Sequence, residues 1–371
     1  MKQRFKKHVA LTLISLMLLS LIGCGKPAST DTTTTTETAV TEAPAASISD
    51  AATTADSTSA DASEEGSDAQ TVYPVTVTDQ AGREVTIEKE PESIVSGYYI
   101  STSLLLALGL KDKVTGIEAK ASKRPIYKLA APEFLELPNV GTAKEFDLET
   151  CASLSPELVI LPMKLKDAAQ SLSELDIPVL LVNPENEDQL EQMIELVSTA
   201  TNTKENADAL LSYIDEKKEM LEKDLSGVDA KSVYLAGNSS LLSTAGPAMY
   251  QSGLIELAGG KNAASEITDT YWAEISYEQL LAWDPSYIIL ASDAEYTPED
   301  VLNDENLKEC TAVKNGNVYA IPGDVEALDS PVPGGILASI WLAGILHPDQ
   351  VSADMYTEEK AAFYETFYGI K

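Results

Sequence analysis

Short apolar runs alternate with longer amphipathic segments in the part of the chain that follows residue 72. The runs are rich in Val, Ile and Leu and are often followed by Gly, Pro or Asn, which is typical of buried strands. We expect strands at 93–96, 114–117, 158–161 and 179–182, and helices at 102–108, 164–175 and 187–199. Such alternation predicts a parallel sheet covered by helices.

A hairpin is expected before this series and a long helix after it. Residues 75–79 and 84–87 alternate apolar and polar side chains and are separated by Ala81-Gly82, which predicts a hairpin. Residues 204–225 are highly charged, with apolar residues every three or four positions, which predicts a helix of about 33 Å. Its apolar positions are Ala207, Leu210, Leu211, Ile214, Met220 and Leu221.

A second series follows the long helix, with strands expected at 232–236, 287–290 and 318–321 and helices at 248–258 and 335–345. The predicted fold class is therefore α/β, with two lobes joined by a single long helix. The predicted boundaries are 72–202 for the N-terminal lobe, 203–226 for the linker helix and 227–371 for the C-terminal lobe. One large α/β domain with a long surface helix is the alternative.

The first residues are typical of an export signal. Four basic residues precede an apolar run at 9–22, which is too short to span a bilayer comfortably and ends at Gly23-Cys24. A small residue directly before Cys24 would let a lipoprotein signal peptidase remove residues 1–23 and leave Cys24 free for lipidation. We therefore expect a lipid anchor at the extracytoplasmic face of the cell membrane. An ordinary secretory signal is the alternative.

The segment 24–71 consists largely of Thr, Ser, Ala and acidic residues with few large apolar side chains. Such a segment cannot bury enough surface to offset its chain entropy, so we expect a disordered stalk. A long stalk on a lipid anchor fits a Gram-positive-type envelope better than a free periplasmic protein.

Acidic residues dominate the chain, with 59 Asp and Glu against 26 Lys and Arg and a net charge of −33. Loss of the four basic residues before Cys24 makes this −37 (−33 − 4). This charge disfavours nucleic acid and anionic lipid as partners. Arg83 and Arg124 are the only arginines beyond residue 24, so a guanidinium here is informative about where an anion could be bound.

The chain has few residues for metal or covalent chemistry. Beyond Cys24 it contains two cysteines, Cys151 and Cys310, and one histidine, His347, which precedes a proline and resembles a helix terminator. These counts exclude a metal site of several imidazoles and disfavour a disulfide framework and Ser-His-Asp or Cys-His catalysis. We expect neither an enzyme nor a bound cofactor. A stalked adhesion or scaffold protein is the alternative from another class.

A set of motifs resembles the ABC-transporter solute-binding proteins for ferric siderophores, haem and cobalamin. In the N-terminal lobe these are NVGT at 139–142, FDLE at 146–149 and LSPELVI at 154–160. In the C-terminal lobe they are AGGKN at 258–262, ISYEQLL at 275–281, WDPSYIIL at 283–290, GNVYAIP at 316–322 and WLAGILHP at 341–348. The chain resembles the class III, helical-backbone binding proteins, and the resemblance covers nearly all of residues 73–371.

The resemblance implies two Rossmann-like lobes joined by one rigid helix, with the ligand in the cleft between them and little hinge closure. It also implies a partner, an ABC permease with its ATPase, on which the loaded protein docks. The positions that match the docking glutamates of the family are Glu149 and Glu278. An alternative role for each is that of an acid favoured at a helix N-terminus. We expect a monomer.

The ligand should contact loops at the carboxyl ends of the strands. The candidates in such loops are Tyr98, Tyr99, Lys120, Lys123, Arg124, Tyr127, Lys144, Asn238 and Trp272, and the loop 324–329 is expected there too. Three cations within five positions suggest a ligand with anionic oxygens, although pairing with nearby acids is the alternative.

Two positions bear on the identity of the ligand. Trp272 precedes Glu278 by six residues, the spacing of a ligand-stacking tryptophan in the cobalamin-binding relative, whereas the matching N-lobe position is Ala143. This difference argues against a copy of the cobalamin site. We expect a ferric siderophore as ligand, with cobalamin, haem or a molybdate-like oxyanion as alternatives.

Overall fold

The computed structural model describes residues 70–268 and 270–371. The predicted signal segment 1–23, the predicted lipid site Cys24 and all but the last two residues of the predicted stalk lie outside this part of the chain. Within it, no helix combines the length and the apolar character needed to cross a membrane.

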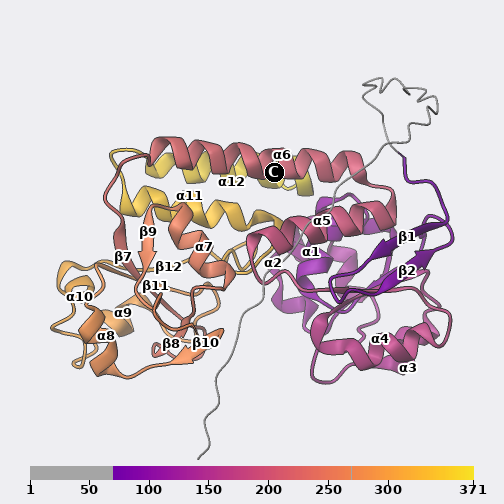
Figure 1. Cartoon of the computed structure of the whole chain (residues 1–371), viewed down its shortest axis with the longest axis horizontal. Coiled ribbons are helices and arrows are strands. Elements are labelled where there is room, and N and C mark those ends of the chain that lie inside the picture. The colour runs from indigo at the N-terminus through magenta and orange to yellow at the C-terminus, as the bar shows by residue number, and fades with distance from the viewer. Residues whose placement is uncertain (1–69, 269) are drawn as a thin grey trace, which may run out of the picture. The chain divides into compact units, whose positions relative to one another are not determined.

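The N-terminal lobe, coloured indigo to magenta in Figure 1, has a four-stranded parallel sheet at its centre. Its strands are β3 (Ile94–Ser96), β4 (Val114–Gly116), β5 (Leu158–Pro162) and β6 (Val179–Val182), arranged in the order β4–β3–β5–β6. The helices are α1 (Tyr99–Ala107), α2 (Pro125–Ala130), α3 (Leu148–Ser153), α4 (Lys166–Ser173) and α5 (Glu187–Thr201). Every residue of β5 and β6 is buried, which explains their uninterrupted apolar sequences.

The C-terminal lobe repeats this arrangement. Its parallel strands are β7 (Lys231–Ala236), β9 (Gly260–Asn262), β11 (Tyr287–Leu290) and β12 (Val318–Ala320), in the order β12–β11–β7–β9. Its helices are α7 (Tyr250–Leu257), α8 (Tyr277–Trp283), α9 (Pro298–Leu302), α10 (Thr311–Asn315), α11 (Ile336–Leu346) and α12 (Ala353–Tyr368). The predicted two-lobed α/β fold with parallel sheets is confirmed.

Both sheets have the same topology. In each, the strand that comes first in the chain lies between the second and the third, and the fourth lies at the far edge. The direction of winding therefore reverses beside β3 in one lobe and beside β7 in the other. In open α/β sheets ligands bind beyond the carboxyl ends of the strands at such a reversal. The topology therefore predicts that a ligand contacts the loops after β3, β5, β7 and β11.

Two antiparallel strand pairs supplement the parallel sheets. Strands β1 (Val75–Thr78) and β2 (Glu84–Ile87) form the predicted hairpin, in which Val75 is opposite Ile87. Strands β8 (Ser243–Ala245) and β10 (Trp272–Glu274) form a second pair, in which Trp272 is opposite Ala245. The sequence did not predict this second pair, because neither three-residue strand has a clear alternating pattern.

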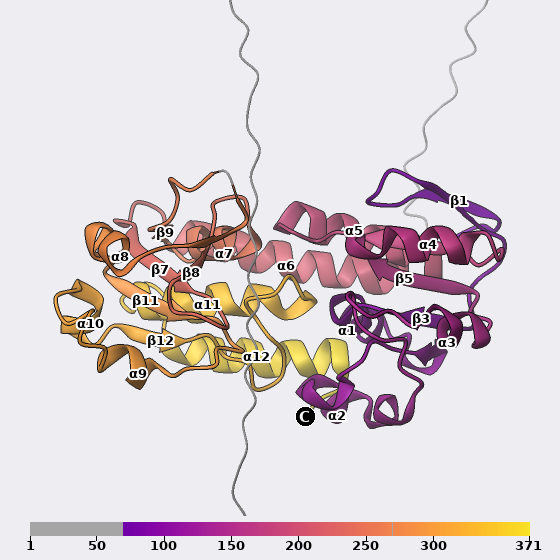
Figure 2. The ribbon, with the colours of Figure 1, turned by 90° about the horizontal axis from the view of Figure 1, so that it is seen from below.

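The chain passes from one sheet to the other through α5 and α6 (Lys204–Asp224), and α6 packs on α5 in one lobe and on α11 in the other. The C-terminal helix α12 also links the lobes, because it packs on both α11 and α1 (Figure 2). One apolar cluster includes Leu104 of α1, Leu210 of α6 and Leu342 of α11. Because separation of the lobes would expose this shared cluster, we infer that the lobes resist wide opening.

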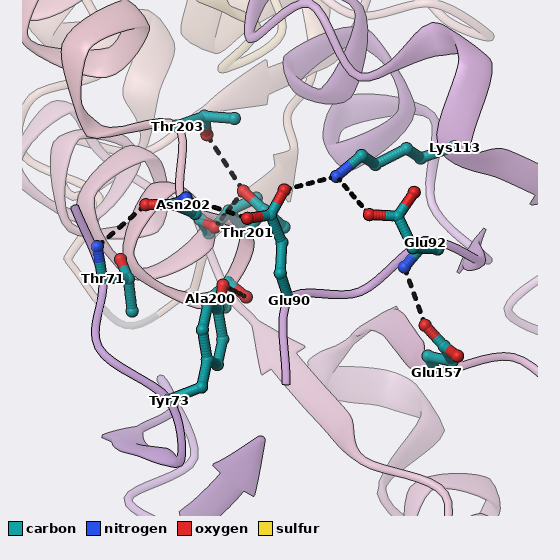
Figure 3. A network of polar contacts seen from close by, with 11 residues as sticks. Thr71, Tyr73, Glu90, Glu92, Lys113, Glu157, Ala200, Thr201, Asn202 and Thr203 are labelled. Carbon is teal, nitrogen blue, oxygen red and sulfur yellow. Dashed lines mark hydrogen bonds and ion pairs between the residues drawn. The ribbon is translucent and has the colours of Figure 1, made fainter. Parts of the chain in front are cut away.

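A polar network holds the start of the described chain against the junction of α5 and α6 (Figure 3). The backbone N–H of Thr71 donates to Asn202 Oδ1 at 2.8 Å, and Asn202 Nδ2 donates to Glu90 Oε2 at 2.8 Å. Lys113 Nζ then donates to Glu90 Oε1 at 2.6 Å, which together with the bond from Asn202 lowers the pKa of Glu90. The network therefore fixes the point at which the chain enters the folded region.

Candidate ligand-binding site

A small cavity lies where segments that follow β3, β4, β11 and β12 meet. Its volume is about 20 Å³, enough for roughly one water molecule. Its lining includes Tyr99, Ser103, Lys123 and Arg124 from the N-terminal lobe and Asp293 and Glu326 from the C-terminal lobe. Because these segments follow the carboxyl ends of strands in both sheets, the cavity lies where a ligand cleft is expected.

Two larger hollows, of about 510 and 550 Å³, are more open to solvent. The first lies between α6 and α7 and is lined by three glutamates and no cation. The second contains Arg83, whose Nη2 donates to Asp79 Oδ2 and to the Val179 carbonyl, each at 2.7 Å. The cation of the second hollow is already neutralised by its salt bridge with Asp79 and the first hollow has no cation, so the cleft between the lobes is the better candidate site for an anion.

Arg124 is the most distinctive residue of the cavity. Its guanidinium carbon lies 3.9 Å from the centroid of the Tyr99 ring, which is a cation–π arrangement. Its Nη1 lies 3.8 Å from Asp293 Oδ2, too far for a hydrogen bond. Among the described residues, no acceptor forms a hydrogen bond with this guanidinium, although its side chain is only 28% exposed. Arg124 therefore faces the cleft with unused N–H donors.

Tyr99 supports Arg124 and also joins the lobes. Its hydroxyl donates to Ser330 Oγ across the cleft at 2.9 Å. The ring of Tyr98 meets that of Tyr99 edge to face, with centroids 5.4 Å apart. Burial raises the pKa of both hydroxyls, so both tyrosines are neutral donors at physiological pH. Together they provide an aromatic support for the guanidinium.

Glu326 occupies the inner wall of the cavity and is fully buried. It accepts hydrogen bonds from Ser103 Oγ and, at 3.1 Å, from the Tyr364 hydroxyl, while Ser103 is also hydrogen-bonded to the Tyr368 hydroxyl at 2.9 Å. Burial raises the pKa of Glu326 to about 7, so near neutral pH a substantial fraction of its carboxyl groups carries a proton. Ser103 and Glu326 thus connect the two lobes through a group that titrates near pH 7.

A second buried carboxyl lies beneath the N-lobe side of the cleft. Glu118 accepts hydrogen bonds from the Tyr127 hydroxyl at 2.6 Å and from Thr102 Oγ1 at 2.7 Å. Burial raises the pKa of Glu118 despite these bonds. Tyr127, a predicted ligand residue, lies on α2 with its ring fully buried and its hydroxyl directed to Glu118. The contact with Glu118 positions α2, which begins directly after Arg124.

The structure brings some of the predicted cations to the cavity and not others. Lys123 lines it and is otherwise exposed, next to Arg124 in the sequence. Lys120 is exposed and has a left-handed backbone conformation with φ of 71°. Lys144 and Asn238 are exposed and do not line the cavity. Lys123 and Arg124 are therefore the two predicted cations at the cavity.

Trp272 lies on β10 rather than in a loop, and is 41% exposed. Its ring packs on Gly237, the residue that follows β7, where a Cβ would come within 3.0 Å of Trp272 Cζ3. The neighbouring Tyr271 is 56% exposed. These two aromatic residues therefore provide an exposed apolar surface near the carboxyl end of β7, outside the lining of the small cavity.

Glu149 and Glu278, the predicted docking residues, are exposed in the first turns of α3 and α8. The N-cap of α3 is Asp147, whose side chain accepts from the Thr150 N–H, and the N-cap of α8 is Ser276, whose side chain accepts from the Gln279 N–H. Each lobe thus presents one such glutamate to solvent. This position is compatible both with docking and with a favourable interaction with the helix dipole.

The remaining candidate groups have structural explanations. His347 caps α11 and its Nε2 lies 2.9 Å from the Gly259 carbonyl. Cys151 and Cys310 are buried free thiols in different lobes. Within residues 70–268 and 270–371, no group of three or more His, Cys, Asp and Glu side chains is arranged to hold a metal ion.

Sequence patterns did not single out the cavity residues Ser103, Asp293 and Glu326, or Ser330, the hydrogen-bond partner of Tyr99. Glu326 lies in the loop 324–329, which the sequence placed at the cleft. The burial of its side chain could not be predicted from the sequence. Asp293 lies three positions after the predicted strand β11. Its place in a loop at the carboxyl end of a strand could have indicated a cleft residue.

Comparison with known proteins agrees with this architecture. The family described as periplasmic binding protein matches residues 94–325, more than half of the chain. The chain belongs to the periplasmic binding protein family. This confirms the prediction that the chain is a solute-binding protein and not an enzyme.

Three similar proteins illustrate the range of this family. An uncharacterized ABC transporter substrate-binding lipoprotein, YvrC of Bacillus subtilis, is 28% identical over 70% of this chain and 82% of its own. The molybdate-binding protein MolA of Haemophilus influenzae is 24% identical over 79% of this chain and 90% of its own. A periplasmic solute-binding protein of Veillonella parvula has a similar structure, with a TM-score of 0.71 and 26% identity over 80% of this chain and 93% of its own.

Proposed function

We propose that this protein, a solute-binding component of an ABC importer, captures a small oxyanion in the cleft between its lobes, with Arg124 as the principal binding residue. The observation that carries the proposal is the state of the two arginines. Arg83 forms a salt bridge with Asp79 through Nε and Nη2, and its Nη2 also donates to the Val179 carbonyl. Arg124 lines the cleft without a hydrogen-bonded partner among the described residues. A planar guanidinium with free donors favours a ligand with several oxygens.

The size of the cleft supports a small ligand. The cavity holds about 20 Å³, and the Tyr99–Ser330 bond and the Ser103–Glu326 bond close its walls. A tetrahedral oxyanion could enter after side-chain shifts around Arg124. To enter this cavity, a siderophore complex or a corrinoid would require these bonds to break and the lobes to separate. The 24% identical relative named for molybdate supports the same ligand class.

A ferric siderophore, the ligand favoured by the sequence, is the second candidate. Tyr271 and Trp272 support it, because their exposed rings near the carboxyl end of β7 provide a stacking surface that a tetrahedral oxyanion does not need. Such a complex would bind farther out, between these rings and Lys123.

We also propose that the ligand-bound protein docks on the permease through two exposed glutamates. Glu149 and Glu278 would each contact a cationic residue of the permease, one from each lobe, and fix the orientation of the complex more than its affinity. A lipid on Cys24 and the stalk that follows would keep the protein, acting as a monomer, near the permease and raise its local concentration.

Isothermal titration of the purified protein with molybdate, ferric tris-catecholate, cobalamin and haem tests the proposed ligand class. We expect molybdate to bind, and R124Q to weaken binding by about 10- to 100-fold, because one or more charge-assisted hydrogen bonds are lost. The matched control is K128Q, which removes an exposed positive charge from α2, the helix that begins directly after Arg124. Binding of molybdate that survives R124Q, or binding of the catecholate complex alone, would contradict the oxyanion proposal.

A further inference from the structure

Asp293 is the C-lobe carboxylate that faces the free guanidinium of Arg124. Its Oδ2 lies 3.8 Å from Arg124 Nη1, and its side chain is 60% exposed. Among the described residues, its carboxylate accepts no hydrogen bond. Its position is nevertheless well defined, because the surrounding backbone is held by three contacts.

These contacts come from both sides of Asp293. The Ser292 N–H donates to Asp329 Oδ1 at 3.2 Å, and the Ala294 N–H donates to the Ala291 carbonyl at 3.1 Å. The Glu295 N–H donates to the Asn238 carbonyl at 2.8 Å. The turn is therefore fixed at each neighbour of Asp293, while the carboxylate itself projects unbonded beside Arg124.

We propose that Asp293 is a specificity-determining residue that competes with the ligand for Arg124 and sets the ligand charge that the cleft accepts. The proposal rests on the proposed function, binding of an oxyanion at Arg124. An oxyanion that binds the guanidinium must occupy the space that Asp293 faces, because both residues line the same small cavity. Its charge then opposes that of Asp293.

A purely structural role for the Arg124–Asp293 pair is the competing explanation. A pair at 3.8 Å without a hydrogen bond, with one partner 60% exposed, contributes little to stability. The lobes are already joined by the Tyr99–Ser330 bond and by the Ser103–Glu326 bond. Removal of the Asp293 charge should therefore change binding and leave folding nearly unaffected.

The effect on binding should depend on ligand charge, since Coulomb energy is proportional to it. Molybdate and perrhenate are both tetrahedral oxyanions of similar size, with charges of −2 and −1. For partly screened charges about 6 Å apart, loss of one negative charge should strengthen perrhenate binding about 5-fold. The corresponding gain for molybdate is the square of this, about 25-fold.

Isothermal titration of wild type and D293N with both anions, at one fixed ionic strength, measures this difference. The control E295Q removes the same charge from the next exposed acid on the loop, and we expect it to change either affinity by less than about twofold. D293N should melt within about 3 °C of wild type.

Three results would overturn the inference. These are equal gains for the two anions in D293N, no gain for either anion in D293N although wild type binds molybdate, or a large loss of thermal stability in D293N. Failure of both anions to bind to wild type and D293N alike would instead overturn the proposed function, so the two failures are distinguishable.

Discussion

Replacement of Glu326 by glutamine should make the protein more stable at alkaline pH. Glu326 is fully buried at the wall of the cleft, where its carboxyl accepts hydrogen bonds from Ser103 and Tyr364. Burial raises its pKa from 4.5 to about 7, with Arg124 and the two hydrogen bonds lowering it only in part. Glutamine keeps the size and an acceptor oxygen but cannot ionise.

The sign and size of the effect follow from linkage. Below pH 4.5 the carboxyl of Glu326 is protonated in the folded and the unfolded chain, so its titration has no effect on stability. Between pH 4.5 and about 7 the unfolded chain releases the proton and the folded one keeps it, so stability falls as pH rises. Above pH 7 the ionised Glu326 lowers the free energy of unfolding by its full amount. This amount is about 3 kcal/mol, because the two pKa values differ by about 2.5.

Urea unfolding of wild type and E326Q at pH 5 and pH 8 measures this cost. The free energy of unfolding of E326Q, relative to that of wild type, should be about 2–3 kcal/mol higher at pH 8 than at pH 5. The buried Glu118 is present in both proteins, so its titration cancels in the difference. The control E358Q, at an exposed position on α12, should show no such gain. A stability difference between E326Q and wild type that does not change with pH would show that the pKa of Glu326 is not raised in the folded protein.

Three further predictions concern the core, the support of Arg124 and docking. L104A should lower the free energy of unfolding by about 2–5 kcal/mol in urea titrations, since Leu104 is fully buried in the cluster that both lobes share. Y127F should lower it by about 1–2 kcal/mol, because Glu118 loses a donor, and equal stability of Y127F and wild type would contradict that contact. The double variant of Glu149 and Glu278 to glutamine should abolish uptake of molybdate by cells while molybdate binding in titration is unchanged, and uptake at the wild-type rate would exclude docking through these residues.

Much of the fold could be predicted from the sequence because its parallel strands are buried on both faces. The run at 287–290 contains only Tyr, Ile and Leu, and β11 spans the same four residues. The long helix was also predictable, since its apolar positions lie on one stripe: α6 begins at the predicted residue and ends one residue earlier. These elements have local patterns that directly reflect their burial.

Other elements lacked such a pattern. The strands β8 and β10 have three residues each, too few to establish a period. The C-terminal helix α12 mixes charged residues with Phe363, Tyr364 and Tyr368, whose burial depends on α1 and α11. Tertiary contacts of this kind leave little trace in the local sequence.

The same limit applies to the site. Arg124 could be found because arginine is rare in this chain and because three cations lie together. The inward direction of the Tyr127 hydroxyl and the approach of Asp293 to Arg124 depend on contacts over 9 and 169 positions of sequence. Neither follows from spacing, so these parts of the site required the folded structure.

Anomalous X-ray scattering from crystals of the protein soaked in molybdate locates the bound anion and therefore shows whether it binds at Arg124. We expect one molybdenum peak in the cleft between the lobes, within hydrogen-bonding reach of the Arg124 guanidinium, and its loss in crystals of R124Q. A peak confined to other surfaces, or none in the cleft at saturating molybdate, would contradict the claim that this protein binds an oxyanion at Arg124.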